Sequence, residues 1–521
     1  MKIRPRRGRT LVLIPLVLSL MLVIPQLIGS AQPDEQQFAS IDSYVEEQMD
    51  RSRIPGVALS IIRDDEIIHA RGFGETAKSA EAVDPDTLFG IGSTGKSITA
   101  LAVMQLVEAG QIDLDAPVQE YIPWFSLADE QMSGQISVRH LLNMTSGIPA
   151  TAGGEAFRST ESMTPEAALR SLQSASFAYE PGTRFEYVNA NYVILGHLIE
   201  VVTGQTYGDY VQQHIFDPLE MENTYTDLEQ SRKAGFTGGH RYWFGQPVAH
   251  QMDPLPALVP AGYIVSTAED LSNYLMMYLN DGVFAGQQIL SASGIEEMHR
   301  GVAEATLGPW AGGAPARYAM GWYVGGPWGD GSMIFHPGSE PTSTAMLTLD
   351  RENNAGTVTL MNAATEMMLP GAAGALRTIP AGVVSILNGE EPGTASLNRF
   401  YLLFDLVIAS VIGLQIFTLV RLVRRPTASH KAWMRRALPL VWEFGVVAVI
   451  ALAPAVLGMS WRSILLWTPD MGIAAMTIAG LALITGLVRL AQLVRYRPAR
   501  LQAAETDPVP QTGTSVHRPA T

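Results

Sequence analysis

Two residues three positions apart, Ser93 and Lys96, have the types and spacing of a nucleophile and its base. They stand at the start of a dense apolar segment, Ser97–Ala109, which is typical of a helix and ends at Gly110. Residues three apart share one face of a helix, so the lysine amine can reach the serine hydroxyl and help to remove its proton. The positive end of the helix dipole would stabilise the developing charge. By itself the spacing is common, and a helix-capping serine followed by a solvated lysine explains it equally well.

A second candidate pair is Tyr187 and Asn189, which lie just before an apolar helix predicted over Ala190–Val202. Residues two apart in an extended segment point the same way, so a phenol and an amide would face one cleft. Tyr187 could relay protons, and Asn189 could hold a substrate amide and Lys96. A core tyrosine followed by an asparagine that caps the helix is the simpler interpretation of this pair alone.

The third candidate is the segment His336–Ser339, at the end of a predicted strand. Gly338 would permit close approach of a ligand to the backbone. The backbone N–H of Ser339 could join that of Ser93 in holding an oxyanion. Taken alone, the segment is explained more simply as a corner between a strand and a turn.

Other chemistries have little support in the sequence. The chain has no cysteine, which excludes disulfides, thiolate catalysis and zinc–cysteine sites. Ser93 has Ile91 rather than glycine two residues before it, so it is not in a G-x-S-x-G elbow, and no H-E-x-x-H or phosphate-loop motif is present. His140, His197 and His214 are explained as packed or surface histidines. We therefore expect no metal and no cofactor.

The elements around these candidates predict an α+β domain over residues 32–398, with one antiparallel sheet, helices on its faces and a helical lobe. The block has no internal repeat and no linker, and a site would lie between sheet and lobe. Strands are predicted at both ends and helices in the middle. The predicted strands are Val57–Ile62, Glu66–Ala70, Met320–Val324, Ser332–His336, Ser343–Leu349 and Gly356–Met361, and the predicted flanking helices are Ile41–Arg53 and Thr365–Arg377.

Apolar segments lie on both sides of this block. Residues 1–31 combine basic residues, an apolar run and small residues, which is typical of a signal peptide or signal anchor. Residues 399–497 contain three segments that are each long enough to cross a membrane. These predicted spans are 400–420, 437–459 and 471–494.

The distribution of charge predicts the orientation of the chain in a membrane. Lys and Arg gather between the first and second spans and after the third, whereas the loop between the second and third holds only Arg462. Because basic loops stay in the cytoplasm, residues 32–398 should be extracytoplasmic, and 498–521 should be a disordered cytoplasmic tail. Asp405 and Glu443 lie within the spans near an end, where an interfacial position explains them better than a proton relay.

The body of the chain is strongly acidic. Residues 1–31 carry a charge of +5, residues 399–521 carry +8, and residues 32–398 carry −28. Such a body repels nucleic acid, so no nucleic-acid partner is expected.

Together and in this order, the three motifs resemble the S-x-x-K, Y-x-N and K/H-x-G marks of the serine β-lactamase and penicillin-binding-protein superfamily. The branch is that of the class C β-lactamases, D,D-peptidases and related esterases. The resemblance covers 38–390 and includes four further stretches. These are Leu114–Val118, Val138–Pro149 with its T-S-G-I-P ending, Pro260–Leu271 with A-G-x-x-S-T-x-x-D-L, and Met320–Trp322 before the last strands.

The resemblance implies a β-lactamase/transpeptidase-like fold and a role for each motif residue. Ser93 would be acylated, and Lys96 would be its base or proton shuttle. Tyr187 would activate the hydroxyl or the deacylating water, and Asn189 would help to orient these groups. His336 would replace the lysine that is usual in true β-lactamases, which lowers the charge available to a substrate carboxylate and predicts poor β-lactam hydrolysis. The segment containing Gly338 would bind substrate, and the N–H groups of Ser93 and Ser339 would form the oxyanion hole.

We therefore expect a multi-pass cell-membrane protein with an extracytoplasmic serine hydrolase domain. Its substrate would be an amide or ester, with cell-wall peptides leading, as in a D,D-carboxypeptidase or D-amino-acid peptidase, and with small esters as the nearest alternative. Its partners would be such a small molecule or peptide, or a β-lactam, together with the lipid bilayer. A receptor that is acylated by a β-lactam or cell-wall peptide without turnover stays open as an alternative.

Overall fold

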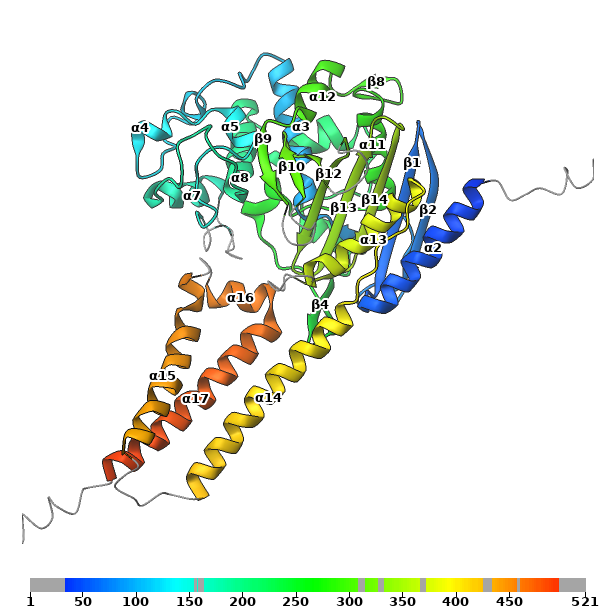
Figure 1. Ribbon diagram of the computed structural model, residues 1–521. Helices are drawn as coiled ribbons and strands as arrows, with labels where there is room; N and C mark the ends of the chain where they lie inside the picture. The colour runs from blue at the N-terminus through cyan, green and yellow to red at the C-terminus, as the bar shows by residue number, and fades with distance from the viewer. Residues whose placement is uncertain are drawn as a thin grey trace, which may run out of the picture. The chain divides into compact units, whose positions relative to one another are not determined.

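The computed structural model describes residues 33–153, 157, 164–307, 314–326, 332–365, 372–424, 433–456 and 460–495. The predicted signal segment 1–31 and the predicted tail 498–521 lie outside the described residues. The chain divides into two compact units between Tyr401 and Leu402, and each is described by itself (Figure 1).

An eight-stranded antiparallel sheet forms the centre of the first unit. Its order is β2-β1-β14-β13-β12-β11-β10-β9, so the N-terminal hairpin pairs with a strand from the far end of the domain, with Val57 opposite Met361. This arrangement confirms the predicted α+β fold. The strands are β1 Gly56–Arg63, β2 Glu66–Gly74, β9 Ala303–Thr306, β10 Pro315–Tyr318, β11 Tyr323–Gly325, β12 Ile334–Glu340, β13 Ser343–Asp350 and β14 Ala355–Met361.

Helices cover both faces of this sheet (Figure 1). On one face α2 (Pro33–Ser52) packs against α13 (Ala372–Leu387), and the Tyr44 hydroxyl donates to the Thr378 carbonyl at 2.8 Å. On the other face α11 (Ala268–Leu279) lies against β1 and β14 with a row of fully buried apolar and aromatic side chains. Because helices cover both faces, the central strands β1, β13 and β14 are buried over almost their whole length.

The helical lobe is built around α3 (Gly95–Glu108) and α8 (Asn189–Thr203), which pack against each other. Short helices surround them, and several begin at a Ser, Thr or Asp whose side chain caps the first turn. These are α4 Glu130–Ser133, α5 Val138–Leu142, α7 Pro165–Arg170, α9 Tyr207–Val211, α10 Leu228–Lys233 and α12 Ala292–His299. The structure therefore confirms the predicted helical lobe.

Small sheets complete the first unit. The three-stranded β15-β4-β5 sheet and the pairs β3-β6 and β7-β8 lie within or beside the part predicted to be helical and irregular. Their strands are β3 Phe89–Gly90, β4 Gly239–Trp243, β5 Gln246–His250, β6 Val265–Ser266, β7 Val283–Phe284, β8 Gln287–Gln288 and β15 Ala363–Ala364.

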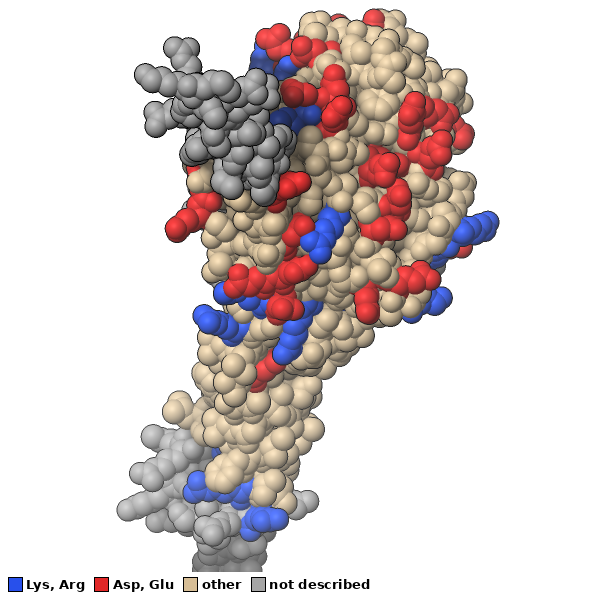
Figure 2. Space-filling view, turned by 90° about the vertical axis from the view of Figure 1, so that its right-hand side faces the viewer, with Lys and Arg blue, Asp and Glu red and all other residues tan. Residues whose placement is uncertain are grey.

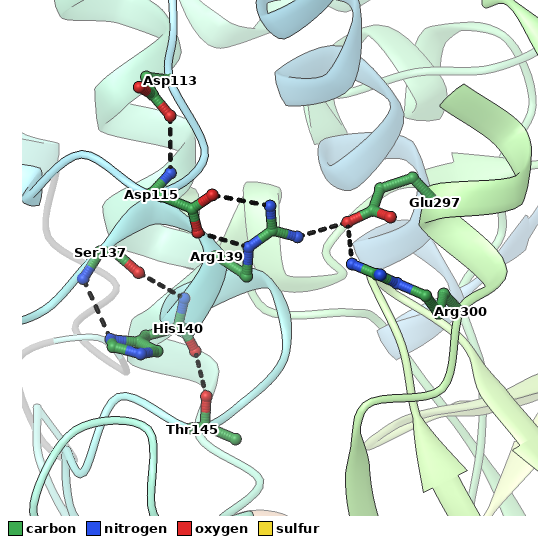
Figure 3. A network of polar contacts seen from close by, with 8 residues as sticks. All are labelled: Asp113, Asp115, Ser137, Arg139, His140, Thr145, Glu297 and Arg300. Atoms are coloured by element: carbon green, nitrogen blue, oxygen red, sulfur yellow. Dashed lines mark hydrogen bonds and ion pairs between the residues drawn. The ribbon is translucent and has the colours of Figure 1, made fainter. Parts of the chain in front are cut away.

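Within the lobe, an ion-pair network links α5 and the loop at Asp115 to α12 (Figure 3). The Arg139 guanidinium contacts both carboxylate oxygens of Asp115, at 2.6 and 3.0 Å, and also pairs with Glu297. Glu297 accepts a second ion pair from Arg300 at 2.7 Å. The Arg139 guanidinium lowers the pKa of Asp115. A bidentate contact fixes the orientation of the arginine and carboxylate groups. The network therefore holds α5 and the loop at Asp115 in place against α12.

Several predicted elements differ in extent, among them the first helix, which begins at Pro33 rather than at Ile41. The strand predicted over Met320–Val324 is only Tyr323–Gly325, because Gly321 adopts a positive φ of 77° and turns the chain. The strand predicted to end at His336 continues to Glu340. The C-terminal helix, described over Ala372–Leu387, continues beyond its predicted end at Arg377.

The second unit has, among its described residues, three helices long and apolar enough to cross a membrane: α14 (Leu397–Arg424), α15 (Trp433–Val456) and α17 (Pro469–Arg495). A short helix, α16 (Trp461–Trp467), lies between the last two. Glu443 of α15, expected at an interface, forms an ion pair of 2.8 Å with Arg489 of α17. In Figure 2 this unit shows a largely uncharged surface, whereas acidic side chains are spread over the visible face of the first unit.

Candidate active site

Ser93 lies in a short 3₁₀ turn, η1 (Gly92–Thr94), between β3 and α3. Gly92 has a φ of 56°, a conformation that favours glycine, and a Cβ there would lie 2.5 Å from the Ser339 nitrogen. The Ile91 N–H donates to the Ile264 carbonyl at 3.0 Å, and the Thr94 hydroxyl donates to the Ile91 carbonyl at 2.8 Å. These contacts fix the turn and leave Ser93 half-buried at the start of the helix.

Lys96 is fully buried directly behind this serine. Its amine nitrogen lies 3.0 Å from the Ser93 oxygen and 2.5 Å from the Ala261 carbonyl oxygen. It also lies 5.0 Å from the centre of the Tyr187 ring. Burial lowers the pKa of Lys96 well below its ordinary value, and no acidic side chain among the described residues opposes this. An uncharged amine in this position can accept the serine proton.

Tyr187 lies in the extended segment before α8 and faces the same site. Its ring is edge-on to Tyr318 and tilted toward His336, with ring centres 6.2 Å away in both cases. Its hydroxyl is buried and has no hydrogen-bond partner among the described residues. Burial raises the pKa of Tyr187 well above 10, and the nearby Ser93 hydroxyl opposes this only in part. Tyr187 is therefore a neutral phenol, able to donate a proton to a group that arrives beside it.

His336 is buried and uncharged. Its Nδ1 lies 2.8 Å from the Pro337 carbonyl oxygen, which can only accept, so Nδ1 carries the proton. Its Nε2 then accepts from the Tyr318 hydroxyl at 3.3 Å. Burial first, and then the charge that Lys96 carries when it is protonated, lower the pKa of His336 to about 3. The site therefore has no fixed cation at this position at neutral pH.

Strand β12 brings its residues against the nucleophile turn because side chains alternate between its two faces. His336, Gly338 and Glu340 share one face, and a Cβ on Gly338 would lie 2.0 Å from the Ile91 carbonyl oxygen. The pairing of β12 with β11 covers only Ile334 and Phe335. From His336 onward, that edge of the strand is therefore not paired with β11, and the turn approaches it instead.

Asn189 is the motif residue that the structure does not bring to the lysine. It is exposed at the first position of α8, and among the described contacts it makes no hydrogen bond to Lys96. The Ala261 carbonyl accepts from the lysine instead. The buried amide of this helix is Asn191, whose Oδ1 accepts from the Ser146 hydroxyl at 2.7 Å.

Three groups that contact the site carried no predicted role. Ala261 lies in the A-G-x-x-S-T stretch, and this stretch was a signal for the family but not for a lysine contact. Glu340 could have been found from the sequence, because alternate residues of a strand share one face and Glu340 lies four residues after His336. Tyr318, the partner of His336, carried no sequence signal.

Residues 41–378, more than half of the chain, match the family described as Beta-lactamase. The chain belongs to this family. It is a serine hydrolase with the α+β fold shared by beta-lactamases and penicillin-binding proteins, as its three motifs predicted.

Curated relatives include Protein flp of Staphylococcus aureus (strain MW2), which is 25% identical over 479 residues, 88% of this chain and 89% of that protein. That share exceeds residues 1–401, so the similarity extends into the unit of apolar helices. Penicillin-binding protein 4 of Amycolatopsis lactamdurans is 30% identical over 261 residues, 48% of this chain and 66% of that protein.

Two solved structures of similar fold cover about two thirds of the chain. The octameric penicillin-binding protein homologue from Pyrococcus abyssi has a TM-score of 0.57 and 29% identity, covering 69% of this chain and 79% of that one. The D-amino acid amidase from Ochrobactrum anthropi SV3, complexed with D-phenylalanine, has a TM-score of 0.56 and 24% identity, covering 68% of this chain and 100% of that one. The second likeness is one of fold alone.

Proposed function

We propose that this beta-lactamase-family protein is a membrane-anchored extracytoplasmic hydrolase that cleaves an amide or ester through an acyl-enzyme on Ser93. The observation that carries the proposal is the distance of 3.0 Å between the Lys96 amine and the Ser93 hydroxyl. The amine is fully buried, and burial lowers its pKa, so it can act as a base near neutral pH.

In the acylation step, Lys96 takes the Ser93 proton as the serine oxygen bonds to the substrate carbonyl carbon. The backbone N–H groups of Ser93 and Ser339 stabilise the negative charge that develops on the carbonyl oxygen. When the bond to the leaving amine or alcohol breaks, the leaving group takes that proton from Lys96, directly or through Tyr187. An ester on Ser93 remains, and Lys96 is neutral again.

Deacylation repeats these transfers with water as the nucleophile. Lys96 accepts a water proton through the Tyr187 hydroxyl, and the resulting oxygen attacks the acyl carbon. The ester bond then breaks, Ser93 recovers its proton, and the acid product leaves. The buried hydroxyl of Tyr187 is suited to this relay because none of the described protein groups holds it elsewhere.

We propose cell-wall peptides as the substrate class, cleaved as by a D,D-carboxypeptidase or D-amino-acid peptidase, with small esters as the nearest alternative. The penicillin-binding protein relatives and the fold of a D-amino acid amidase support peptide-like amides. The neutral His336 gives little charge attraction to a substrate carboxylate, which weakens β-lactam turnover. Asn189, exposed at the start of α8, would contact the substrate amide rather than Lys96.

The membrane part of the proposal rests on the three apolar helices and on the basic residues that flank them. Because basic loops are retained in the cytoplasm, the hydrolase unit would be extracytoplasmic and the C-terminus cytoplasmic. Residues 1–31 would export it as a signal peptide or signal anchor.

The proposal is tested by intact-mass spectrometry of the full chain in detergent. The probes are a fluorescent penicillin, p-nitrophenyl acetate and D-phenylalanine amide. We expect an adduct on Ser93 that clears as an ester or amide turns over, and no adduct or turnover in Ser93→Ala. Ser97→Ala is the matched control, because that serine lies one turn further along α3 and bonds to the Thr94 carbonyl and Tyr274 instead.

The other outcomes separate the alternatives. A lasting Ser93 adduct without turnover of any probe would favour a receptor that is acylated and not released. Turnover that persists in Ser93→Ala would refute the acyl-enzyme on this serine.

A further inference from the structure

A buried carboxyl group lies beneath the nucleophile turn and has no part in the steps above. Glu340 is the last residue of β12, directly after Ser339, and it is 1% exposed. Its Oε1 accepts a hydrogen bond from the Gly92 N–H at 3.2 Å. The next residue along the chain from Gly92 is Ser93, so one contact joins β12 to the nucleophile turn.

The second oxygen of this carboxyl is unusual. Oε2 of Glu340 is buried and has no hydrogen-bond partner among the described residues, and it lies 2.4 Å from where a Cβ on Gly90 would be. Burial raises the pKa of Glu340 well above its ordinary value, which favours the neutral acid. An unpaired buried polar atom lowers stability, so a side chain of this kind is better explained by function than by packing.

The place of Glu340 relates it to the two proposed oxyanion donors. Gly92 precedes Ser93, and Glu340 follows Ser339, so the bond between Gly92 and Glu340 lies next to both donors along the chain. The backbones already touch there, since a Cβ on Gly92 would lie 2.5 Å from the Ser339 nitrogen. A change in this bond shifts one donor relative to the other.

We propose that Glu340 is a positioning residue, whose side-chain oxygen holds the Gly92 N–H and so sets the spacing of the two oxyanion donors. The inference rests on the proposed acyl-enzyme at Ser93. In this role Glu340 acts through the Gly92 N–H and not by contact with the substrate. Its function requires an acceptor oxygen and no negative charge.

The test compares Glu340→Gln with Glu340→Leu in the full chain in detergent, with p-nitrophenyl acetate as the probe. Gln keeps an oxygen that can accept from Gly92, whereas Leu fills similar space without one. We expect Glu340→Gln to keep kcat within about threefold and Glu340→Leu to lose at least about tenfold in kcat with little change in KM, because donor geometry acts on the transition state. Thr359→Val is the matched control: it removes another buried oxygen, unpaired among the described residues, two strands away on β14 and should leave kcat unchanged.

A second measurement keeps the test valid if Glu340→Leu folds poorly. A phosphonate ester that phosphonylates Ser93, with loss of its alcohol, places a phosphoryl oxygen in the oxyanion hole. Its inactivation rate, corrected for the folded fraction, should fall in Glu340→Leu and be kept in Glu340→Gln. Equal rates in the three proteins, or equal losses in both variants, would overturn the inference. Failure of the acyl-enzyme itself is recognised separately, because Ser93→Ala would then stay active.

Discussion

Lys96 has only the Ser93 hydroxyl and the Ala261 carbonyl as hydrogen-bond partners among the described residues, and neither carries a charge. A buried ammonium without a counterion is unfavourable, which is why the pKa of Lys96 is lowered. The half-buried Tyr187 and the buried His336 are both neutral, so the described residues of the reaction site hold no permanent ion pair.

The lowered pKa of Lys96 predicts how the rate of hydrolysis depends on pH. The protonated lysine cannot accept the Ser93 proton, so kcat/KM should rise with pH through the lowered pKa of Lys96 and reach its plateau well below pH 10.5. Lys96→Arg keeps a cation that cannot lose its proton and should lower kcat/KM by about 10²–10⁴-fold. The check is ester turnover between pH 5 and 9. An arginine variant that retained activity within about tenfold would exclude Lys96 as the base.

At the scale of elements, the site depends on how closely strand β12 meets the η1 turn. The two segments are far apart in sequence, yet Gly338 and Gly92 each lie within contact distance of the other segment's backbone. Neither contact tolerates a side chain, so the fit between strand and turn rests on two glycines.

Gly338→Ala should therefore disturb the site. Its Cβ would lie 2.0 Å from the Ile91 carbonyl oxygen, which forces the turn and the strand apart. We expect a loss of about 10²-fold in kcat, because a displacement near ~1 Å has that effect on reacting geometry. Ester turnover and the melting temperature check this. Gly393→Ala is the control, since nothing lies within 4 Å of a Cβ there and its activity should be unchanged.

Much of the fold was predictable because it rests on local patterns. The hairpin β1-β2 and strands β13 and β14 are short apolar runs bounded by turn residues, and α3 and α8 are long apolar segments with clear starts. The site motifs were predictable as a set, since their order resembles that of a known family.

The rest depends on contacts that no local pattern carries. The approach of Glu340 to Gly92 joins residues 248 positions apart, and the Ala261 carbonyl reaches Lys96 across 165 positions. Asn189 is the residue that fits the motif spacing, and only the start of α8 decides that it is exposed whereas Asn191, two residues further on, is buried.

At the scale of the whole molecule, buried histidines link the stability of the hydrolase unit to pH. Burial lowers the pKa of both His336 and His299 to about 3. The unfolded chain takes up these protons near pH ~6.5, whereas the folded chain does not, so stability falls as the pH drops below that value. The buried acids Asp270 and Glu340, with raised pKa values, act in the opposite direction.

His299→Phe isolates the contribution of one buried histidine to the pH dependence of stability. Neither ring nitrogen of His299 has a hydrogen-bond partner among the described residues, and its ring packs against Tyr278 and Trp322, so Phe loses little contact. Between about pH 6.5 and 5 the wild type should lose about 2 kcal/mol more than the variant. Thermal unfolding of both proteins in detergent at the two pH values measures this. An equal loss in both would show that His299 is protonated in the folded state.

The pairing of β1 with β14 also determines when the hydrolase unit can be completed during synthesis. Val57 is made about 300 residues before its partner Met361. At ordinary rates of translation this separates the two by about 15–60 s. Through that interval one edge of β1 lacks its neighbour and is open to pairing with another chain. Any factor that shields nascent strands would therefore act on the β1-β2 hairpin first. The exposed edge is covered only when β14, the last strand of the sheet along the chain, has been made.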